Sequence, residues 1–280
     1  MALSPVYVQM FADRFDIDYQ AHRKLANTVK EVHGVVGDAY KEKLMAQVDM
    51  AQHGAYGADI PATAVSATAP STTFTDYDLK LVLDHFESLN INANVVSAYS
   101  EDHAAAMGRR EDQYIIDSVV AAATKSVSVG SSNLTIDKLI AANALLGLDE
   151  VMGKKHLVIH ANNLRGLMKD TSHQIGSSDY NQVRALVNGE INFYMGFFFH
   201  VLGTRTMNGV AEGLPITGNN RTCIAYAEKA ATMAYRLDPQ VKMVEVPENF
   251  RVETLSLLSA GCVVGRPKGV CTIICDESAS

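Results

Sequence analysis

Residues 106–117 read AMGRREDQYIID and set paired arginines beside paired acids, between two apolar stretches. Such a cluster could belong to an active site, a phosphate clamp or the polar side of a long helix. Apolar or small residues recur around it at spacings of three and four, at Val96, Tyr99, His103, Met107, Ile115, Val119 and Ala122. This spacing predicts a helix of about 30 residues, roughly 45 Å long. The spacing fails only at Glu111, so the cluster lies near the middle of the helix.

The segments on either side of this helix contain both strand and helix patterns. Alternating apolar residues at 77–83 predict a strand, and Thr135–Leu146 predicts a second helix that Gly147 closes. A short buried strand is expected around 157–159, a brief helix at 163–168, and apolar strands within 177–215. Residues 222–235 are Ala-rich and read as partly helical, and two strands flank a turn at 265–269. Strands and helices do not alternate regularly, which predicts an α+β fold with a mixed or antiparallel sheet.

Residues 38–75 have a different character. Gly54, Gly57, Pro61 and Pro70 interrupt any helix, and the flanking segments are only weakly apolar on both faces. We expect a long two-stranded ribbon that is marginal alone and needs a partner surface. The residues before it contain one helix-like segment around 18–32.

The bulk composition limits the classes of function. The chain has 280 residues, enough for one large domain or two lobes, and a net charge of −7 from 24 basic and 31 acidic residues. The acidic excess argues against a protein that grips nucleic acid broadly through its phosphates. No apolar run reaches the roughly 20 residues that span a bilayer, and the N-terminus does not read as a secretory signal.

The sequence contains no recognisable catalytic motif. It lacks a Gly-rich nucleotide loop and a nucleophile elbow, so we expect no cofactor and no catalytic residue. His156 and His160 share a face of the predicted strand, but no third ligand is evident, and structural histidines are expected in preference to a metal site. Four cysteines lie in mostly apolar surroundings and are expected to be buried free thiols, which weakly favours folding in the cytoplasm: Cys223, Cys262, Cys271 and Cys275.

The serial order of these segments resembles the major capsid proteins of tailed bacteriophages, which have the Hong Kong-97-type fold. The resemblance covers residues from about 35 to about 275. AMGRREDQYIID is similar to part of the long spine helix of that family, and NLTIDKLIAANALL (133–146) is similar to the helix that follows. KKHLVIHANNLRGLM (154–168) and VNGEINFYMGFFFHV (187–201) are similar to segments of the axial lobe.

The resemblance implies a fold and a division of the chain. It implies an α+β, Hong Kong-97-like capsid fold with an N-terminal arm (1–35), an extended β-ribbon loop (36–75) and a peripheral domain with the spine helix (76–147). An axial domain (148–250) and C-terminal strands returning to the peripheral domain (251–280) would follow. The extended loop would lie across a neighbouring subunit.

The resemblance also implies a function. Copies of the chain would assemble as hexamers and pentamers into an icosahedral head that encloses double-stranded DNA without sequence-specific binding. Assembly would take place in the host cytoplasm and leave the protein in the virion, away from any membrane. Scaffolding and portal proteins would be its other partners, with a decoration protein as a further candidate.

Charged residues of the helix and ribbon are the candidate inter-subunit contacts: Arg109, Arg110, Glu111, Asp112, Lys41, Lys43, Asp49 and Asp59. In this interpretation the helix cluster is solvated in the free subunit and sets register against a neighbour's ribbon. Three alternatives stay open at this point. They are an encapsulin-type nanocompartment shell, a soluble α+β enzyme with a site at His156 and His160, and a minor virion or decoration protein.

Overall fold

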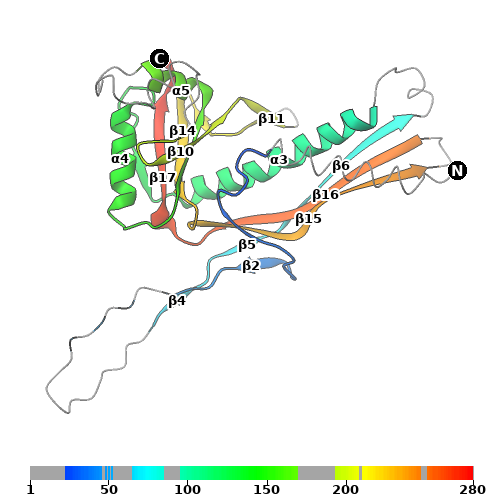
Figure 1. The fold of residues 1–280 in the computed structure, drawn as a ribbon, viewed down its shortest axis with the longest axis horizontal. Helices are drawn as coiled ribbons and strands as arrows, with labels where there is room; N and C mark the ends of the chain where they lie inside the picture. Colours follow the sequence, from blue (N-terminus) through cyan, green and yellow to red (C-terminus); the bar gives the residue numbers. More distant parts are fainter. Residues whose placement is uncertain are drawn as a thin grey trace, which may run out of the picture.

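The computed structural model describes residues 23–45, 48, 50, 52, 65–84, 95–169, 193–207, 210–246 and 251–279. Figure 1 shows an elongated molecule in which a lobe of helices and strands lies at one end and a long helix runs away from it beside long strands. A thin two-stranded ribbon projects from the region where the lobe meets the long strands. The architecture is α+β with a Hong Kong-97-like arrangement, as predicted.

The long helix, α3 (Val95–Ala122), contains 28 residues. Buried side chains at Ala104, Met107, Ile115 and Val119 follow the predicted three-and-four spacing, so one stripe of the helix faces the body of the protein. The helix packs on a four-stranded sheet in the order β1-β15-β16-β6, which we call the long sheet. Its strands are β1 (Lys30–Val32), β6 (Thr75–Asp84), β15 (Ala231–Val246) and β16 (Arg251–Val264).

A buried histidine joins the helix to the long sheet. His103 is fully buried, and its two ring nitrogens lie 2.8 Å from Ser256 Oγ and 2.9 Å from Thr254 Oγ1, both on β16. One helical turn from the other end, the Ser118 hydroxyl donates to the carbonyl of Cys262 over 3.0 Å. These polar contacts fix the helix along the strand as well as against it.

The lobe contains a seven-stranded mixed sheet in the order β7-β17-β14-β8-β10-β9, with β13 paired to β14. Two helices lie beside this lobe sheet: α4 (Ile136–Gly147), capped by Thr135, and α5 (Ala161–Lys169) (Figure 1). Its central strands are largely buried: β8 buries five of its six residues and β14 five of its eight. The strands are β7 (Lys125–Val127), β8 (Lys155–His160), β9 (Phe193–Tyr194), β10 (Phe197–Leu202), β13 (Ile216–Thr217), β14 (Asn220–Ala227) and β17 (Val270–Asp276).

A hairpin that belongs to neither sheet and two short 3-10 helices complete the lobe. The hairpin is formed by β11 (Arg205–Met207) and β12 (Val210–Glu212). The short 3-10 helices are η2 (Pro267–Gly269), in the turn before β17, and η3 (Glu277–Ala279), after it.

Two short chain crossings connect the lobe sheet to the long sheet, in addition to the longer connection from β6 to β7 through α3. Residues 228–230 join β14 to β15, and residues 265–269 join β16 to β17. The crossings are hydrogen-bonded to each other, because the Arg266 amide donates to the Ala230 carbonyl over 3.2 Å. The two sheets are therefore tied by adjacent strands of backbone at one point.

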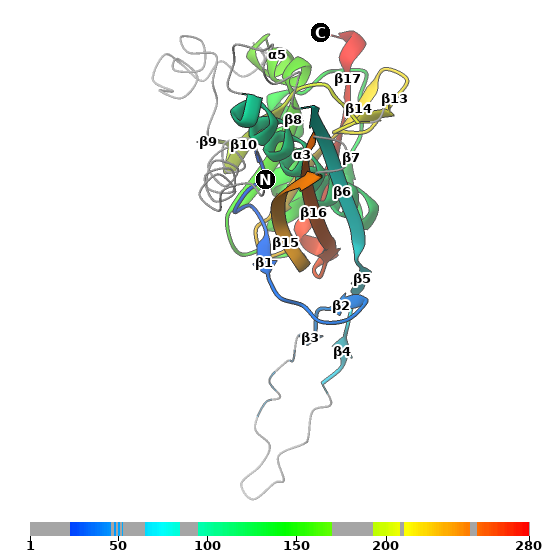
Figure 2. The same cartoon turned by 90° about the vertical axis from the view of Figure 1, so that its right-hand side faces the viewer.

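The ribbon consists of two short antiparallel pairs. β2 (Ala39–Lys41) pairs with β5 (Ser71–Thr73), and β3 (Leu44–Met45) pairs with β4 (Ala67–Thr68). Each of its side chains is exposed or half-exposed. Figure 2, turned by 90° from Figure 1, shows the ribbon extending away from the rest of the molecule. The predicted ribbon is confirmed at its base, while most of its central part lies outside the described residues.

Several local expectations are wrong. Residues 30–32 form a strand and residues 23–29 form a loop of turns and bends rather than a helix, while residues 18–22 of that expected helix lie outside the described residues. The Ala-rich segment 222–235 forms strands of both sheets. The two C-terminal strands do not stay together, because β16 joins the long sheet and β17 pairs with β14 and β7 in the lobe. Burial selects extended structure here over the helical preference of alanine.

The four cysteines are buried and free, as expected. Burial raises the pKa of Cys262 to about 12 and that of Cys271 to about 11, so these thiols stay protonated near neutral pH. Within the part of the chain that the structure describes, no helix combines the length and apolarity needed to cross a membrane.

Candidate assembly surfaces

The acids in the middle of α3 form a buried junction with two other segments. Arg23 Nε lies 2.8 Å from Glu111 Oε2, and Arg205 Nη2 donates to Asp112 Oδ2 over 2.9 Å. The other oxygen of Asp112 accepts from the Leu25 amide over 2.9 Å. Both carboxylates are completely buried. The junction therefore ties the start of the described chain and the β11–β12 hairpin to the spine helix.

This burial corrects the sequence-based interpretation of Glu111 and Asp112. They were expected on the solvated side of the helix, available to a neighbour. Each is instead enclosed and paired with an arginine of the same chain, 88 and 93 residues distant in sequence. A buried carboxylate needs such partners, because leaving it unpaired costs several kcal/mol. The break in apolar spacing at Glu111 marks this polar junction, but nothing local to the cluster identifies Arg23 or Arg205.

The two arginines of the cluster remain partly exposed. The Arg110 guanidinium lies 4.4 Å from the centre of the Tyr77 ring and 3.3 Å from Glu212 Oε1. It therefore bridges the long sheet and the β11–β12 hairpin. Arg109 is half-exposed on the same helix. An inter-subunit role for Arg109 and Arg110 stays a prediction.

The charged ribbon residues differ in what the structure describes. Lys41, at the end of β2, and Lys43, just after it, are both exposed, as an assembly contact would require. Asp49 and Asp59 lie outside the described residues. Near the ribbon, Asp76 at the start of β6 accepts two hydrogen bonds of 2.7 Å from Arg236 and one of 2.5 Å from Ser259. The Ser259 hydrogen bond, followed by the charge of Arg236, lowers the pKa of Asp76.

A groove of about 620 Å³ lies at the base of the ribbon. Leu44, Met45 and Thr68 line it from the ribbon side. The loop after α4 and the two chain crossings form the rest of its wall, with Met152 and Arg266 among the lining residues. Met45 and Met152 are 84% and 79% exposed, so this is an apolar surface without a partner in the described part of the subunit.

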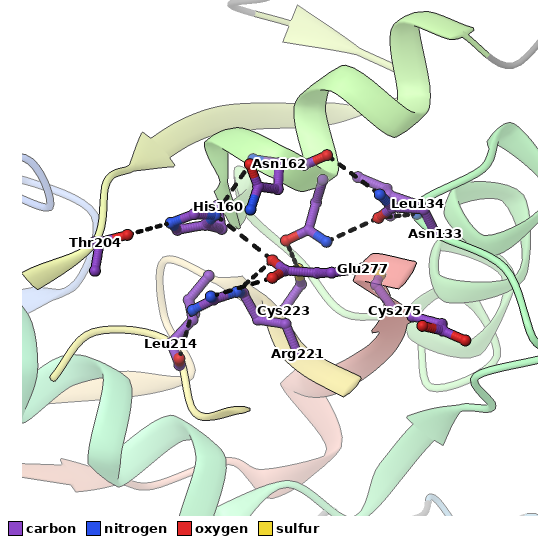
Figure 3. Close-up of polar contacts among 12 residues, drawn as sticks. Asn133, Leu134, His160, Asn162, Thr204, Leu214, Arg221, Cys223, Cys275 and Glu277 are labelled. Atoms are coloured by element: carbon purple, nitrogen blue, oxygen red, sulfur yellow. Dashed lines mark hydrogen bonds and ion pairs between the residues drawn. The ribbon is translucent and has the colours of Figure 1, made fainter. Parts of the chain in front are cut away.

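Figure 3 shows a polar network that fixes the C-terminal end of the lobe. Arg221 on β14 donates to both carboxylate oxygens of Glu277, over 2.5 Å and 3.3 Å. His160 Nδ1 lies 3.6 Å from the same carboxylate and accepts from the Asn162 amide over 3.2 Å. Burial opposes ionisation of Glu277, but the Arg221 contact outweighs it and the pKa is lowered. The network joins β8, β14 and η3.

The two histidines proposed as an alternative enzyme site belong to different contacts. His160 Nε2 lies 3.2 Å from Thr204 Oγ1, whereas His156 Nδ1 lies 3.0 Å from His200 Nε2 on the neighbouring strand β10. Burial lowers the pKa of both residues, that of His156 to about 4. No group of three or more metal-ligating side chains is found among the described residues. The geometry gives these histidines structural contacts within the lobe.

Comparisons with known proteins identify the family and the fold of this chain. The sequence model of the family described as phage capsid protein matches residues 3–277. No curated protein matches the sequence. The structure is similar to that of Mycobacterium phage Che8, with 17% identity, a TM-score of 0.64 and coverage of 93% of this chain and 89% of that chain.

Two further solved structures share the fold. The capsid of cyanophage P-SCSP1u has 12% identity, a TM-score of 0.68 and coverage of 89% of this chain and 86% of that chain. A virus-like particle from Pyrococcus furiosus has 13% identity, a TM-score of 0.64 and coverage of 95% and 99%. The similarity to these structures establishes the fold. The family model establishes the family, because it matches nearly all of the sequence. The chain therefore belongs to the phage capsid protein family and is a structural major capsid protein with the Hong Kong-97-type fold.

Proposed function

We propose that many copies of this chain close into the icosahedral head of a tailed phage as hexamers and pentamers, with each ribbon lying across a neighbouring subunit. The ribbon is the observation that carries this proposal. Its strands pair only with each other among the described residues, and they leave all their side chains exposed or half-exposed. A two-stranded ribbon is marginal alone, so it gains stability on a second surface. Many modest contacts per subunit give a shell large collective stability.

The sheet arrangement supports a refined division of the subunit. We assign α3 and the long sheet to the peripheral domain, and the lobe sheet with α4 and α5 to the axial domain near the symmetry axis. This moves β7, α4 and β17 out of the predicted peripheral segments and β15 into the peripheral domain, because each is assigned with the sheet that it joins or packs on. Residues 1–35 and 36–75 remain the proposed arm and extended loop.

The contents and partners of the shell follow from charge and family. A net charge of −7 suits a container that encloses double-stranded DNA without holding its phosphates tightly. Scaffolding and portal proteins, with a decoration protein as a further candidate, are proposed to act during assembly in the host cytoplasm. The contact candidates on the described surface are the exposed Lys41 and Lys43 and the partly exposed Arg109 and Arg110.

Electron microscopy of the expressed protein tests the proposal. We expect closed shells, tubes or capsomer rings, formed by the chain alone or together with a co-expressed scaffolding protein. A discrete monomer or dimer under both conditions would overturn it.

The contents of purified shells separate the capsid from the encapsulin-type alternative. That alternative has less support, because the matching family is that of phage capsid proteins. Neighbouring portal and terminase genes are expected, and a shell that retains a cargo enzyme instead would favour the alternative.

A further inference from the structure

Two glycines, Gly261 on strand β16 and Gly265 directly after its end, lie where the base of the ribbon crosses this part of the chain. They are four residues apart, and an added side chain at either position would meet the ribbon. Neither residue has the positive φ that would itself require glycine. Glycine at these two positions instead leaves space for the ribbon, which a side chain would fill.

Gly261 lies under the returning strand of the ribbon. A Cβ atom at this position would lie 2.8 Å from the backbone carbonyl oxygen of Thr73 and 3.1 Å from two side-chain atoms of Thr72. Real Cβ atoms essentially never approach that closely. Since the nearest atom belongs to the backbone, rotation of a side chain cannot relieve the overlap, and β5 itself would have to move.

Gly265 lies under the outgoing strand. A Cβ atom there would overlap the carboxylate of Glu42, at 3.0 Å from its Cδ, and would lie 3.3 Å from Leu44 Cδ1. Glu42 is held in place by a hydrogen bond of 3.1 Å that its Oε1 accepts from Thr232 on β15. The nearest atoms belong to a flexible side chain, so this overlap can be relieved if Glu42 gives up that hydrogen bond.

We propose that Gly261 and Gly265 form a seat that sets the direction in which the ribbon leaves the subunit, and that they are positioning residues for its contact with a second copy of the chain. The proposal rests on the assembly function proposed above. The seat contacts both ribbon strands at their base. Other contacts at the base include the Asp38 carboxylate at 3.6 Å from Arg236 Nη1 and the Phe74 ring, whose centre lies 5.9 Å from the Arg236 guanidinium carbon. A small change in direction at the base becomes a large displacement farther along, where the ribbon would meet its neighbour.

Alanine substitutions test the seat. Gly261→Ala and Gly265→Ala are compared with Gly203→Ala, a matched control whose added Cβ meets no atom within 4 Å. One measurement is the yield of particles by electron microscopy. The other is the rate at which trypsin cleaves the soluble, unassembled subunit after Lys41 and Lys43, which reports on how the ribbon is held.

We expect Gly261→Ala to keep a cooperative thermal transition, to be cleaved faster than wild type and to lower particle yield on the order of tenfold, equivalent to about 1.4 kcal/mol. Gly265→Ala should have a smaller effect in the same direction. Because its overlap is with Glu42, adding Gly265→Ala to Glu42→Ala should change less than adding it to the wild type. Gly203→Ala should match wild type in both measurements.

Wild-type cleavage rates and yields for Gly261→Ala would overturn the seat. If Gly261→Ala does not fold, Gly265→Ala becomes the test of the seat. The seat would then be overturned if the effects of Gly265→Ala add fully to those of Glu42→Ala. A wild-type chain that forms no shells would instead refute the proposed function, while the cleavage rates of the soluble protein would still decide whether the glycines hold the ribbon.

Discussion

The body of the subunit and its ribbon bury their side chains to opposite extents. In the lobe, β8 buries five of six residues, and on α3 the acids Glu111 and Asp112 are enclosed with partners of the same chain. In the ribbon, apolar Met45 and charged Lys43 are both exposed. The difference indicates that the stability of the isolated subunit resides in the body. The ribbon adds little to that stability and can gain burial only from another surface.

The largest expected effect comes from breaking the buried junction on α3. Asp112→Ala removes a carboxylate that accepts from Arg205 and from the Leu25 amide, and leaves both donors buried without it. We expect the free energy of unfolding to fall by about 3–5 kcal/mol, measured by chemical denaturation. Lys43→Ala in the ribbon is the comparison, expected to stay within about 0.5 kcal/mol. Similar values for the two variants would contradict the contrast between body and ribbon.

An apolar pair of substitutions tests the same contrast. Leu157 on β8 is fully buried, and Leu157→Ala should lower the free energy of unfolding by about 2–5 kcal/mol through lost burial and a residual cavity. Met45→Ala, at an 84% exposed position, should leave it nearly unchanged. A marked loss of stability from Met45→Ala in unassembled protein would show that the ribbon already packs on its own subunit.

The buried histidines predict a pH dependence of the body. Burial lowers the pKa values of His103, His156 and His200 below the value of about 6.5 expected in the unfolded chain. At pH values between the lowered pKa of the folded protein and about 6.5, the unfolded chain binds more protons than the folded protein does. The stabilisation of the folded state is therefore present above pH ~6.5 and is lost as pH falls toward about 4. Denaturation curves between pH 7 and pH 4.5 should show this decline.

His156→Phe serves as the control for that pH dependence. It removes the group whose pKa is lowered to about 4, so the decline should become shallower. An unchanged slope in this variant would refute the assignment to His156, whatever the absolute stability of the variant.

The smallest expected loss of subunit stability comes from substitution of the partly exposed arginines of α3. Arg110→Ala removes the contact with Tyr77 and the ion pair with Glu212, and should cost about 1 kcal/mol or less. Arg109→Ala should cost less still. Both should fold normally and form fewer shells. Normal particle yields from both variants would reduce these arginines to solvated side chains of the helix.

A feature of the fold can be predicted from the sequence when the residues that determine it lie close together in the chain. The length of α3, the second helix after Thr135 and the base of the ribbon follow from apolar spacing and turn residues, and the structure confirms them. The partners of Glu111 and Asp112 lie far away in sequence, so no local pattern reveals them. The strand β15 was misread because its alanines favour a helix in isolation, whereas here they are buried between other elements.

The paired crossings between the two sheets have a mechanical consequence. A load applied to the long sheet reaches the lobe through residues 228–230 and 265–269, which lie side by side and share the hydrogen bond from Arg266 to Ala230. Bending in the plane of the pair stretches one connection as it compresses the other and is therefore resisted, whereas bending out of that plane deforms both in the same sense and meets less resistance. The helix α3 supplies a third connection, from β6 to β7, and packs on strands of both sheets, so it braces the lobe against that second kind of bending.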